Sequence, residues 1–392
     1  MRRCRLEVAD IFRSCERDFL AQHPTSPQQR KALRDIGVCR TAALGGHLWR
    51  CEQCDHQEIS YNSCRNRHCP KCPGKSRAQW LEARAHDLLP TVYFHVVFTL
   101  PDRLGPLVLQ NQQALYGVLF QTVSQTLLRI ARDPRHLGAK IGFLAVLHSW
   151  GQNLMFHPHV HGVVPGGGLS PDESRWIACR SNFLLSVRVL SRLFRHRFLR
   201  SLDPLYRRGE LALHGRLQPC AHPSDWKSLL QELRQTEWVV YSKRPFGGPH
   251  QVLKYLARYT HWVAISNRRL LSFEQGRLSF RYKDDRRGGL PRTMTLEGVE
   301  FIRRFLLHVL PKNFMRIRSY GFLANSCRRR KLALCRKLLA HSPTDTQPVL
   351  LGNPSASESP SRLYPACGRG PLLVIEILQP LFPAIEERMN SP

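Results

Sequence analysis

The cysteines between residues 51 and 72 constrain the fold of this chain more than any other feature. The segment CEQCDHQEISYNSCRNRHCPKC contains two Cys-x2-Cys pairs, Cys51 with Cys54 and Cys69 with Cys72, separated by 14 residues. Tetrahedral Zn²⁺ takes four sulfur or nitrogen ligands, and paired cysteines at this spacing are typical of structural zinc sites. The sequence therefore predicts a small, closed zinc module in which these four thiolates hold one ion.

Further side chains near these pairs are candidates for a second zinc site, namely Cys39, His47, Cys64 and His68. Some of them could instead enter the first site, and the two histidines could be exposed to solvent or bonded to the backbone. The module is also basic. We expect four of its side chains to contact phosphates, namely Arg65, Arg67, Lys71 and Lys75.

The excess of positive charge indicates the class of partner. Lys and Arg number 59 against 29 Asp and Glu, a formal net charge of +30. Because neutralising phosphates releases condensed counterions, this excess favours nucleic acid. An anionic membrane surface is the alternative, but we find no long amphipathic basic helix, no signal peptide and no apolar run of membrane-spanning length. We expect a cytoplasmic protein, where clustered cysteines bind metal more often than they form disulfides.

Strand and helix signals follow one another without a regular β-α-β alternation. The clearest strand is 91–101, which is rich in β-branched and aromatic residues and bounded by prolines. A long helix is predicted over 105–132, and two strands joined at a Gly-Gln-Asn turn are predicted over 140–168. This mixture predicts an α+β fold with a central antiparallel sheet and flanking helices.

Composition divides the chain into five expected segments. They are an N-terminal helical segment (1–38), the zinc-binding module (39–76), a catalytic domain (90–325), a basic helix (326–341), and a flexible Ser/Pro-rich linker with the C-terminal tail (342–392). The basic helix carries four candidate phosphate contacts, Arg328, Arg329, Arg330 and Lys331. A solvated helix face is the alternative interpretation of this run.

Three histidines at every second position mark a second candidate metal site. The stretch NLMFHPHVHGVVPGGGL carries His157, His159 and His161. Side chains at i and i+2 of a strand point the same way, so His159 and His161 can hold one ion while Val160 faces the core. His157 is a third candidate, although the proline after it leaves its direction less defined. A polar, solvent-facing strand is the alternative.

A pair of tyrosines favours a catalytic role for that metal. In QVLKYLARYTH, Tyr255 and Tyr259 are four residues apart on a predicted helix, which places their hydroxyls on one face. The same helix carries Lys254 and Arg258 as candidate DNA contacts. A phenol with a pKa of about 10 is a poor nucleophile, and a divalent cation beside it would favour phenolate. An aromatic pair packed into the core is the alternative.

Three segments together resemble a known family: HPHVHGVVPGGGLS, KRPFGGPHQVLKYLARYTHWVAISN and YNSCRNRHCPKC. They are similar to the IS91-type transposases, the two-tyrosine members of the HUH class of rolling-circle nucleases. The resemblance extends from LEVADIF near the amino terminus to about RSYGFLAN. It implies the HUH nuclease core, a central antiparallel sheet with flanking helices, preceded by the zinc module.

The resemblance also implies the site and its chemistry. His159 and His161 would hold Mg²⁺ or Mn²⁺, with His157, His148 and Gln152, in that order, as candidates for a third ligand. Tyr255 and Tyr259 would be the nucleophiles that form 5′-phosphotyrosine links with single-stranded element ends during rolling-circle DNA transposition. The covalent link keeps the bond energy, so no ATP is expected, and the chain has no GxxxxGK[ST] loop. The implied setting is the bacterial cytoplasm, in association with the nucleoid.

Near the carboxyl end the chain departs from the family pattern. The family often carries a cysteine pair there, but YPACGRG keeps only Cys367, with Tyr364 where the first cysteine is expected. We therefore predict a free thiol at Cys367 and no second zinc ribbon.

Three other functions remain open at this point. One is a zinc-finger DNA-binding protein whose nuclease core is inactive. Another is a replication initiator or relaxase that uses the same chemistry. The third is a zinc hydrolase with His-x-His on a barrel strand.

Overall fold

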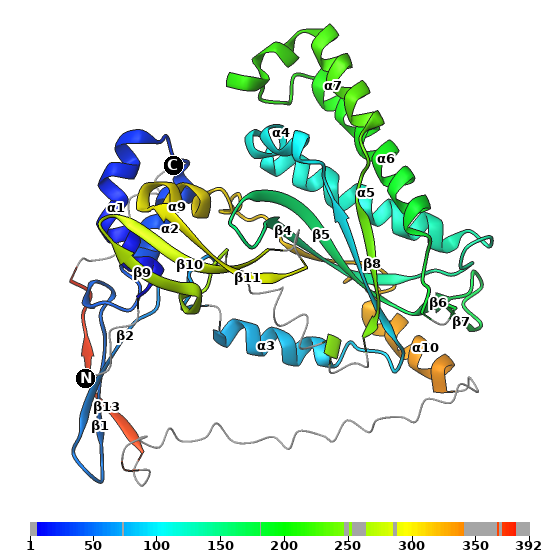
Figure 1. Ribbon diagram of the computed structural model, residues 1–392. Coiled ribbons are helices and arrows are strands. Elements are labelled where there is room, and N and C mark those ends of the chain that lie inside the picture. Colours follow the sequence, from blue (N-terminus) through cyan, green and yellow to red (C-terminus); the bar gives the residue numbers. More distant parts are fainter. Residues whose placement is uncertain are drawn as a thin grey trace, which may run out of the picture.

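A five-stranded antiparallel sheet forms the centre of the molecule (Figure 1). The computed structural model describes residues 6–72, 74–180, 182–246, 251–252, 264–284, 288–340, 367 and 371–381. In spatial order the strands are β12 (Ile317–Gly321), β4 (Gly142–Trp150), β5 (Phe156–Pro165), β3 (Tyr93–Thr99) and β8 (Val240–Phe246). Together with the helices around it, this sheet confirms the predicted α+β class.

One face of this sheet is covered by helices and forms the larger core. Those helices are α4 (Gly105–Gln110), α5 (Gln112–Arg132), α6 (Val187–Arg207) and α7 (Pro223–Gln235). Alternate strand residues such as Phe94, Phe98 and Val160 are buried against them. The helix predicted over 105–132 is interrupted at Asn111, whose side-chain amide donates to the carbonyl of Leu107.

The opposite face of the sheet carries the predicted metal-binding histidines. Val146 and Val163 on this face pack with Val252, which is fully buried and helical. The side chains of Trp80 and Leu81, from α3 (Gly74–Ala85), pack against the same cluster. Figure 1 shows α3 on the side of the sheet away from α4 to α7. Most of the helix predicted around Tyr255 and Tyr259 lies outside the described residues.

A second core joins the amino terminus to the chain after residue 264. It contains α1 (Val8–Gln22), α2 (Pro27–Gly37) and α9 (Gly298–Leu306), together with a sheet of β9 (Leu270–Glu274), β10 (Arg277–Asp284) and β11 (Leu290–Glu297). The rings of Phe12 and Phe305 meet edge to face with centroids 5.2 Å apart. The predicted N-terminal helical segment therefore shares a core with part of the predicted catalytic domain.

A three-stranded sheet protrudes from this second core (Figure 1). Its strands are β2 (Gln57–Tyr61), β1 (Gly46–Cys51) and β13 (Leu372–Leu378), with β1 in the middle. The prediction of a flexible C-terminal tail is thus wrong for 372–378, because LLVIEIL pairs in antiparallel register with β1. The linker 342–362 lies outside the described residues.

Short elements complete the described chain. They are α10 (Arg328–Ala340), β6 (Gly167–Leu169), β7 (Trp176–Ala178), and the 3₁₀ turns η1 (Ala42–Leu44), η2 (Asp102–Leu104), η3 (Gly215–Ala221) and η4 (Asn267–Arg269). Within the described ranges, none of the helices combines the length and apolar character that crossing a bilayer requires.

Candidate metal centres

Three histidines from two neighbouring strands meet on the sheet face opposite α4 to α7. His159 and His161 lie on β5, and His148 lies on β4 directly opposite His159 in the antiparallel register. One ring nitrogen from each lies within 4.8 Å of the other two. The expected strand geometry is therefore observed for His159 and His161, and His148 joins them.

Sequence reasoning ranked the third partner incorrectly. His157 was the first candidate, but its ring is partly exposed and lies 3.3 Å from a carboxylate oxygen of Asp102. Gln152 lies in the turn after β4, where its carbonyl accepts from Arg269. His148 occupies the third position because the β4–β5 register pairs it with His159, which the sequence alone does not determine.

A backbone contact fixes the tautomer of His159. Its Nδ1 lies 2.6 Å from the carbonyl oxygen of His157. A carbonyl oxygen only accepts, so Nδ1 carries the proton and the lone pair is on Nε2. Burial lowers the pKa of His159 to about 4 and holds that of His161 well below its usual range. Both rings are therefore neutral near pH 7, which is the form that binds metal.

His95 is a fourth histidine at this site, and the sequence interpretation missed it. It lies on β3 two residues before Val97, so both side chains point to the same face of the sheet, and Val97 pairs with His161. Its Nε2 is 2.7 Å from Nδ1 of His161, and the two rings are stacked with an interplanar angle of 4°. Burial lowers the pKa of His95 to about 3. A histidine within the apolar, β-branched run YFHVVFT was the available signal.

The four cysteines nearest the second core form one compact cluster. The Sγ atom of Cys72 lies 3.4 Å from that of Cys39 and 3.5 Å from that of Cys64, and Cys69 is 3.6 Å from Cys39. A tetrahedral zinc with bonds of about 2.3 Å separates its sulfurs by about 3.8 Å. Hydrogen bonds from the Cys64 and Cys69 thiols hold the pKa of Cys39 well below its usual range. The spacing of the four sulfur atoms fits zinc.

The predicted grouping of the two Cys-x2-Cys pairs is wrong. Cys51 and Cys54 lie apart from Cys69 and Cys72 and form a separate group with Cys367. The 14 intervening residues contain the second strand of the hairpin, β2, so Cys51 and Cys54 lie at the hairpin tip and Cys69 and Cys72 lie beyond its base. Five residues of strand span about 17 Å, too far for one ion. Cys367, predicted to be a free thiol, lies with its Sγ 3.5 Å from that of Cys51.

The two histidines proposed as zinc ligands have other contacts. The ring of His47 packs against Trp49. His68 is partly buried, and its Nε2 accepts the backbone N–H of Leu310 at 3.4 Å. In the part of the chain that the structure describes, neither histidine belongs to a group of side chains close enough to bind one metal ion. Of the predicted second zinc group Cys39, His47, Cys64 and His68, only the two cysteines belong to an observed cluster, which they form with Cys69 and Cys72.

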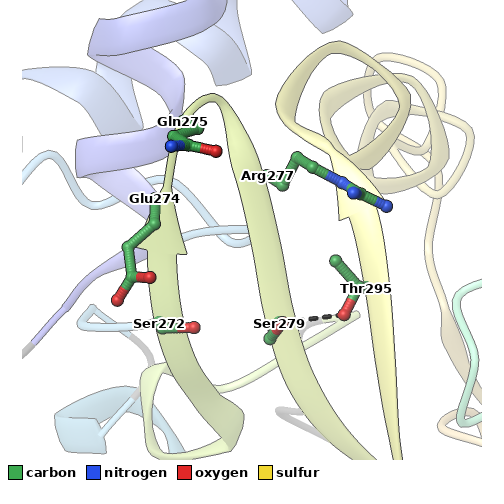
Figure 2. A pocket seen from close by; sticks show the side chains of 6 residues that line it. All are labelled: Ser272, Glu274, Gln275, Arg277, Ser279 and Thr295. Carbon is green, nitrogen blue, oxygen red and sulfur yellow. Dashed lines mark hydrogen bonds between the residues drawn. The ribbon is translucent and has the colours of Figure 1, made fainter.

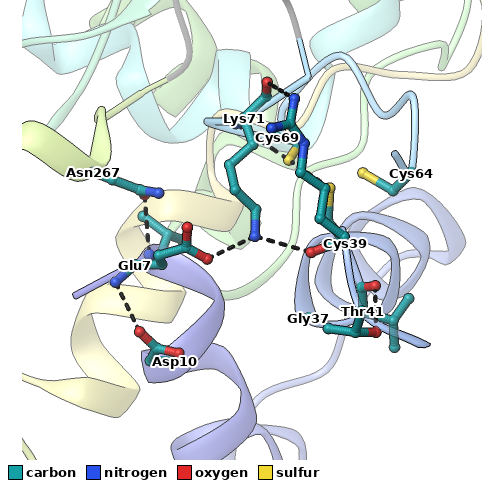
Figure 3. Close-up of polar contacts among 12 residues, drawn as sticks. Glu7, Asp10, Gly37, Cys39, Thr41, Cys64, Cys69, Lys71 and Asn267 are labelled. Carbon is teal, nitrogen blue, oxygen red and sulfur yellow. Dashed lines mark hydrogen bonds and ion pairs between the residues drawn. The ribbon is translucent and has the colours of Figure 1, made fainter. Parts of the chain in front are cut away.

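Two cations of the zinc module hold the fold together. Lys71 Nζ lies 2.6 Å from a carboxylate oxygen of Glu7 and 2.9 Å from the carbonyl of Cys39, as Figure 3 shows. In the same region Asn267 accepts the backbone N–H of Val8. The guanidinium of Arg67 donates to two backbone carbonyls of the loop before β12, those of Pro311 and Phe314. These contacts do not support the predicted phosphate role of Lys71 and Arg67.

The remaining predicted phosphate contacts differ in their availability. On α10, Lys331 pairs with Glu173, and Arg328 Nε lies 3.7 Å from Asp87, whereas the two arginines between them are exposed. Of these remaining cations, Arg65, Arg329 and Arg330 are exposed. Lys254 and Arg258 lie outside the described residues, as does the side chain of Lys75.

Two hollows differ in their relation to the histidines. The one in Figure 2 lies on the β9–β10–β11 sheet, where Ser279 and Thr295 share a hydrogen bond of 2.8 Å, and no predicted site residue lines it. A cleft of about 1060 Å³ instead includes the β4–β5 turn and His157. Arg216, Lys283, Arg303 and Arg304 line this cleft together with Asp102 and Asp284, whereas His148, His159 and His161 do not.

Family models match two parts of the chain. Residues 11–100 match a model described as "Transposase zinc-binding domain", which includes the four-cysteine cluster, the hairpin and His95. Residues 142–331 match a model described as "Putative transposase", which includes His148, His159 and His161. No solved structure matches the chain.

Curated relatives match over most of the chain. "Putative transposase y4qJ" of Sinorhizobium fredii (strain NBRC 101917 / NGR234) is 52% identical over 378 residues, which cover 95% of each chain. "Transposase for insertion sequence element IS801" of Pseudomonas savastanoi pv. phaseolicola is 31% identical over 320 residues, 75% of this chain and 72% of that protein. With the cysteine and histidine clusters in the matching segments, the chain belongs to the IS91-type family of insertion-sequence transposases, whose partner is DNA.

Proposed function

We propose that the chain cleaves and rejoins single-stranded DNA through 5′-phosphotyrosine intermediates during rolling-circle transposition. The observation that carries this proposal is the position of Val252 on the histidine-bearing face of the sheet. Gln251 and Val252 are helical, and Tyr255 and Tyr259 follow three and seven residues after Val252. The helix expected from the sequence around Tyr255 and Tyr259 includes Val252, and we therefore propose that both tyrosines act at the face that holds His148, His159 and His161.

The donor set of the histidine cluster limits which ion it would bind. Three imidazole nitrogens suit a divalent transition metal better than Mg²⁺, which prefers oxygen ligands and retains its waters. Of the two ions that the family resemblance implies, Mn²⁺ is the better fit. When bound at His148, His159 and His161, the ion would polarise a phosphodiester oxygen and stabilise the charge of the transition state.

The bond changes belong to the tyrosines and the DNA. The phenol oxygen of one tyrosine forms a bond to phosphorus, the bond to the 3′ oxygen breaks, the phenol loses its proton and the 3′ oxygen gains one. A 3′-hydroxyl later reverses this exchange on a new strand end. The two steps interconvert esters of similar energy, so no nucleotide hydrolysis is required. Two tyrosines one helical turn apart allow both element ends to be held by one subunit.

His95 would position His161 without touching the DNA. If Nδ1 of His161 donates to Nε2 of His95 across their 2.7 Å contact, the lone pair of His161 is fixed on Nε2, toward the other two histidines. Lys243 on β8 pairs with His95 across the strands and is exposed. Its positive charge beside the histidines would favour an anionic substrate.

The cysteine cluster and the exposed arginines would serve DNA binding. We assign a structural Zn²⁺ to Cys39, Cys64, Cys69 and Cys72, which would anchor the hairpin module to the second core. Arg65, Arg329 and Arg330 are the exposed candidates for phosphate contacts. Lys254 and Arg258 remain candidates on the tyrosine segment.

A covalent-adduct assay tests the proposal. The full-length protein is incubated with Mn²⁺ and a labelled single-stranded oligonucleotide that carries an element end. A protein–DNA adduct is expected with the native chain and with either single Tyr→Phe variant. The Tyr255→Phe plus Tyr259→Phe double variant should form none while it binds the oligonucleotide normally. Binding without any adduct from the native chain would instead support a DNA-binding protein with an inactive nuclease core.

A further inference from the structure

Cys51, Cys54 and Cys367 come together from opposite ends of the chain. We propose that these three thiolates bind a second Zn²⁺, which fastens the C-terminal strand β13 to the hairpin of β1 and β2. The proposal concerns the fold of the three-stranded sheet of β2, β1 and β13 and does not depend on the tyrosine chemistry. The matched zinc-binding segment ends at residue 100, so it does not include Cys367.

The sulfur positions fit a metal better than a covalent bond. The three Sγ atoms all lie within 4.8 Å of one another, and those of Cys51 and Cys367 are 3.5 Å apart. Sulfurs that share a tetrahedral zinc are about 3.8 Å apart, whereas a disulfide requires about 2.0 Å. Three soft sulfur donors also select zinc over the oxygen-preferring ions. Each thiol releases its proton to solvent on binding, and a water molecule would take the fourth position beside the exposed Cys54.

The hairpin tip presents its two cysteines in a defined turn. The N–H of Cys51 donates to the carbonyl of His56 at 3.0 Å, and the N–H of Asp55 donates to the carbonyl of Cys51 at 3.1 Å. Asp55 has a φ of 52°, the left-handed conformation that closes this turn. A backbone hydrogen bond from His56 reaches Cys54. The two ligands are therefore pre-arranged before Cys367 arrives.

Packing alone gives little reason for β13 to stay on β1. The strand is apolar, yet Leu373 and Ile377 are 45% and 64% exposed. It pairs with β1 through a register that shifts between Leu48 and Trp49, and β13 is an edge strand. Ordering β13 against β1 also costs conformational entropy. A metal bond through Cys367, five residues before β13, would offset that cost.

Zinc content of single cysteine variants tests the proposal directly. The full-length protein is purified under reducing conditions, and zinc per chain is measured by mass spectrometry of the metal. Cys367→Ser and Cys51→Ser should each carry one zinc fewer than the native chain. The matched control is Cys220→Ser, a half-buried cysteine outside both clusters, which should keep the native content.

Hydrogen exchange provides a readout that does not depend on metal counting. In Cys367→Ser the amides of β13 and of its partner β1 should exchange at least tenfold faster, while those of α5 keep their native rates. A Cys367→Ser chain with native zinc content and native protection of β13 would overturn the proposal. So would a native chain whose mass is lower by two hydrogens because of a Cys51–Cys367 disulfide.

Discussion

The four-cysteine cluster and the three-histidine cluster differ in how many coordination positions of a bound metal they would leave free. Cys39, Cys64, Cys69 and Cys72 supply four donors, which complete the tetrahedron that zinc prefers. His148, His159 and His161 supply only three nitrogens, so a metal held there retains a position for another oxygen. The number of ligands thus separates a site suited to holding a fold from one suited to binding a phosphate.

The two clusters also differ in what positions their ligands. The cysteines lie in loops and turns, where they are restrained by packing against the second core and by contacts such as that of Lys71 with Glu7 and the carbonyl of Cys39. The histidines lie on β4 and β5, whose hydrogen-bonded register holds them with or without an ion. Removing metal should therefore unfold the first site and leave the geometry of the second nearly intact.

Loss of a cysteine ligand should have the largest effect. Structural zinc contributes roughly 10 kcal/mol to folding in small zinc domains. The Cys69→Ser variant should therefore bind one zinc fewer per chain, and its first 72 residues should no longer unfold in a cooperative transition. Metal analysis and circular dichroism during heating measure both. His159→Ala is the matched variant and should melt within a few degrees of the native chain. If the two variants melt alike, the contrast between the clusters is incorrect.

Among the histidines, His148 and His157 give the sharpest comparison. His148→Ala should lower the rate of adduct formation roughly 10³-fold, because a bound metal is worth several kcal/mol of transition-state stabilisation. His157→Ala should stay within about threefold of the native rate, since His157 contacts Asp102 outside the cluster. Both rates are measured at saturating Mn²⁺, with oligonucleotide binding as the control. The reverse order would restore His157 as the third ligand.

His95 should have a smaller effect, and a different kind of effect. His95→Phe keeps a ring but removes the hydrogen bond to His161, so the apparent Mn²⁺ affinity should fall roughly 10–100-fold. The adduct rate at saturating Mn²⁺ should change little, and His95→Gln should recover part of the affinity. A rate that drops equally at all Mn²⁺ concentrations would mean that His95 acts in another way.

Buried histidines outside both clusters test whether burial alone keeps imidazoles neutral. Burial lowers the pKa of His68 to about 3 and that of His308 to about 4. Below about pH 6.5 the unfolded chain binds protons that the folded chain does not, so the free energy of unfolding falls as the pH drops. At pH 5 the loss is about 2 kcal/mol per histidine.

Denaturant unfolding at pH 7 and pH 5 measures this loss. His308→Gln should reduce the difference between the two pH values, whereas His136→Gln, an exposed position, should not. Equal differences in the two variants would contradict the assignment.

The parts of the site that depend on local pattern could be predicted from the sequence. Strand alternation was enough to place His159 and His161 on one face, and the α+β class followed from the order of strand and helix signals. The third member of the histidine cluster depends on the β4–β5 register, which brings His148 opposite His159 across a turn. His95 depends on the pairing of a more distant strand, β3.

The cysteine partners could not be read from spacing alone. Two Cys-x2-Cys pairs suggested one ion, but strand β2 lies between them and separates the pairs by the length of the hairpin. Cys39 and Cys367 lie far from their partners in sequence, so only the tertiary fold identifies them. The strand LLVIEIL was readable as β-branched and apolar, but the Ser/Pro-rich segment before it favoured the prediction of a flexible tail.

The pairing of β1 with β13 also determines when the amino-terminal sheet can be completed. The register joins Gly46 to Leu378, which are 332 positions apart (378 minus 46). Translation proceeds at roughly 5–20 residues per second, so β13 is synthesised roughly 17–66 s after β1, the strand with which it pairs. A transposase chain still on the ribosome, or one truncated before β13, therefore has its amino-terminal hairpin exposed along one edge.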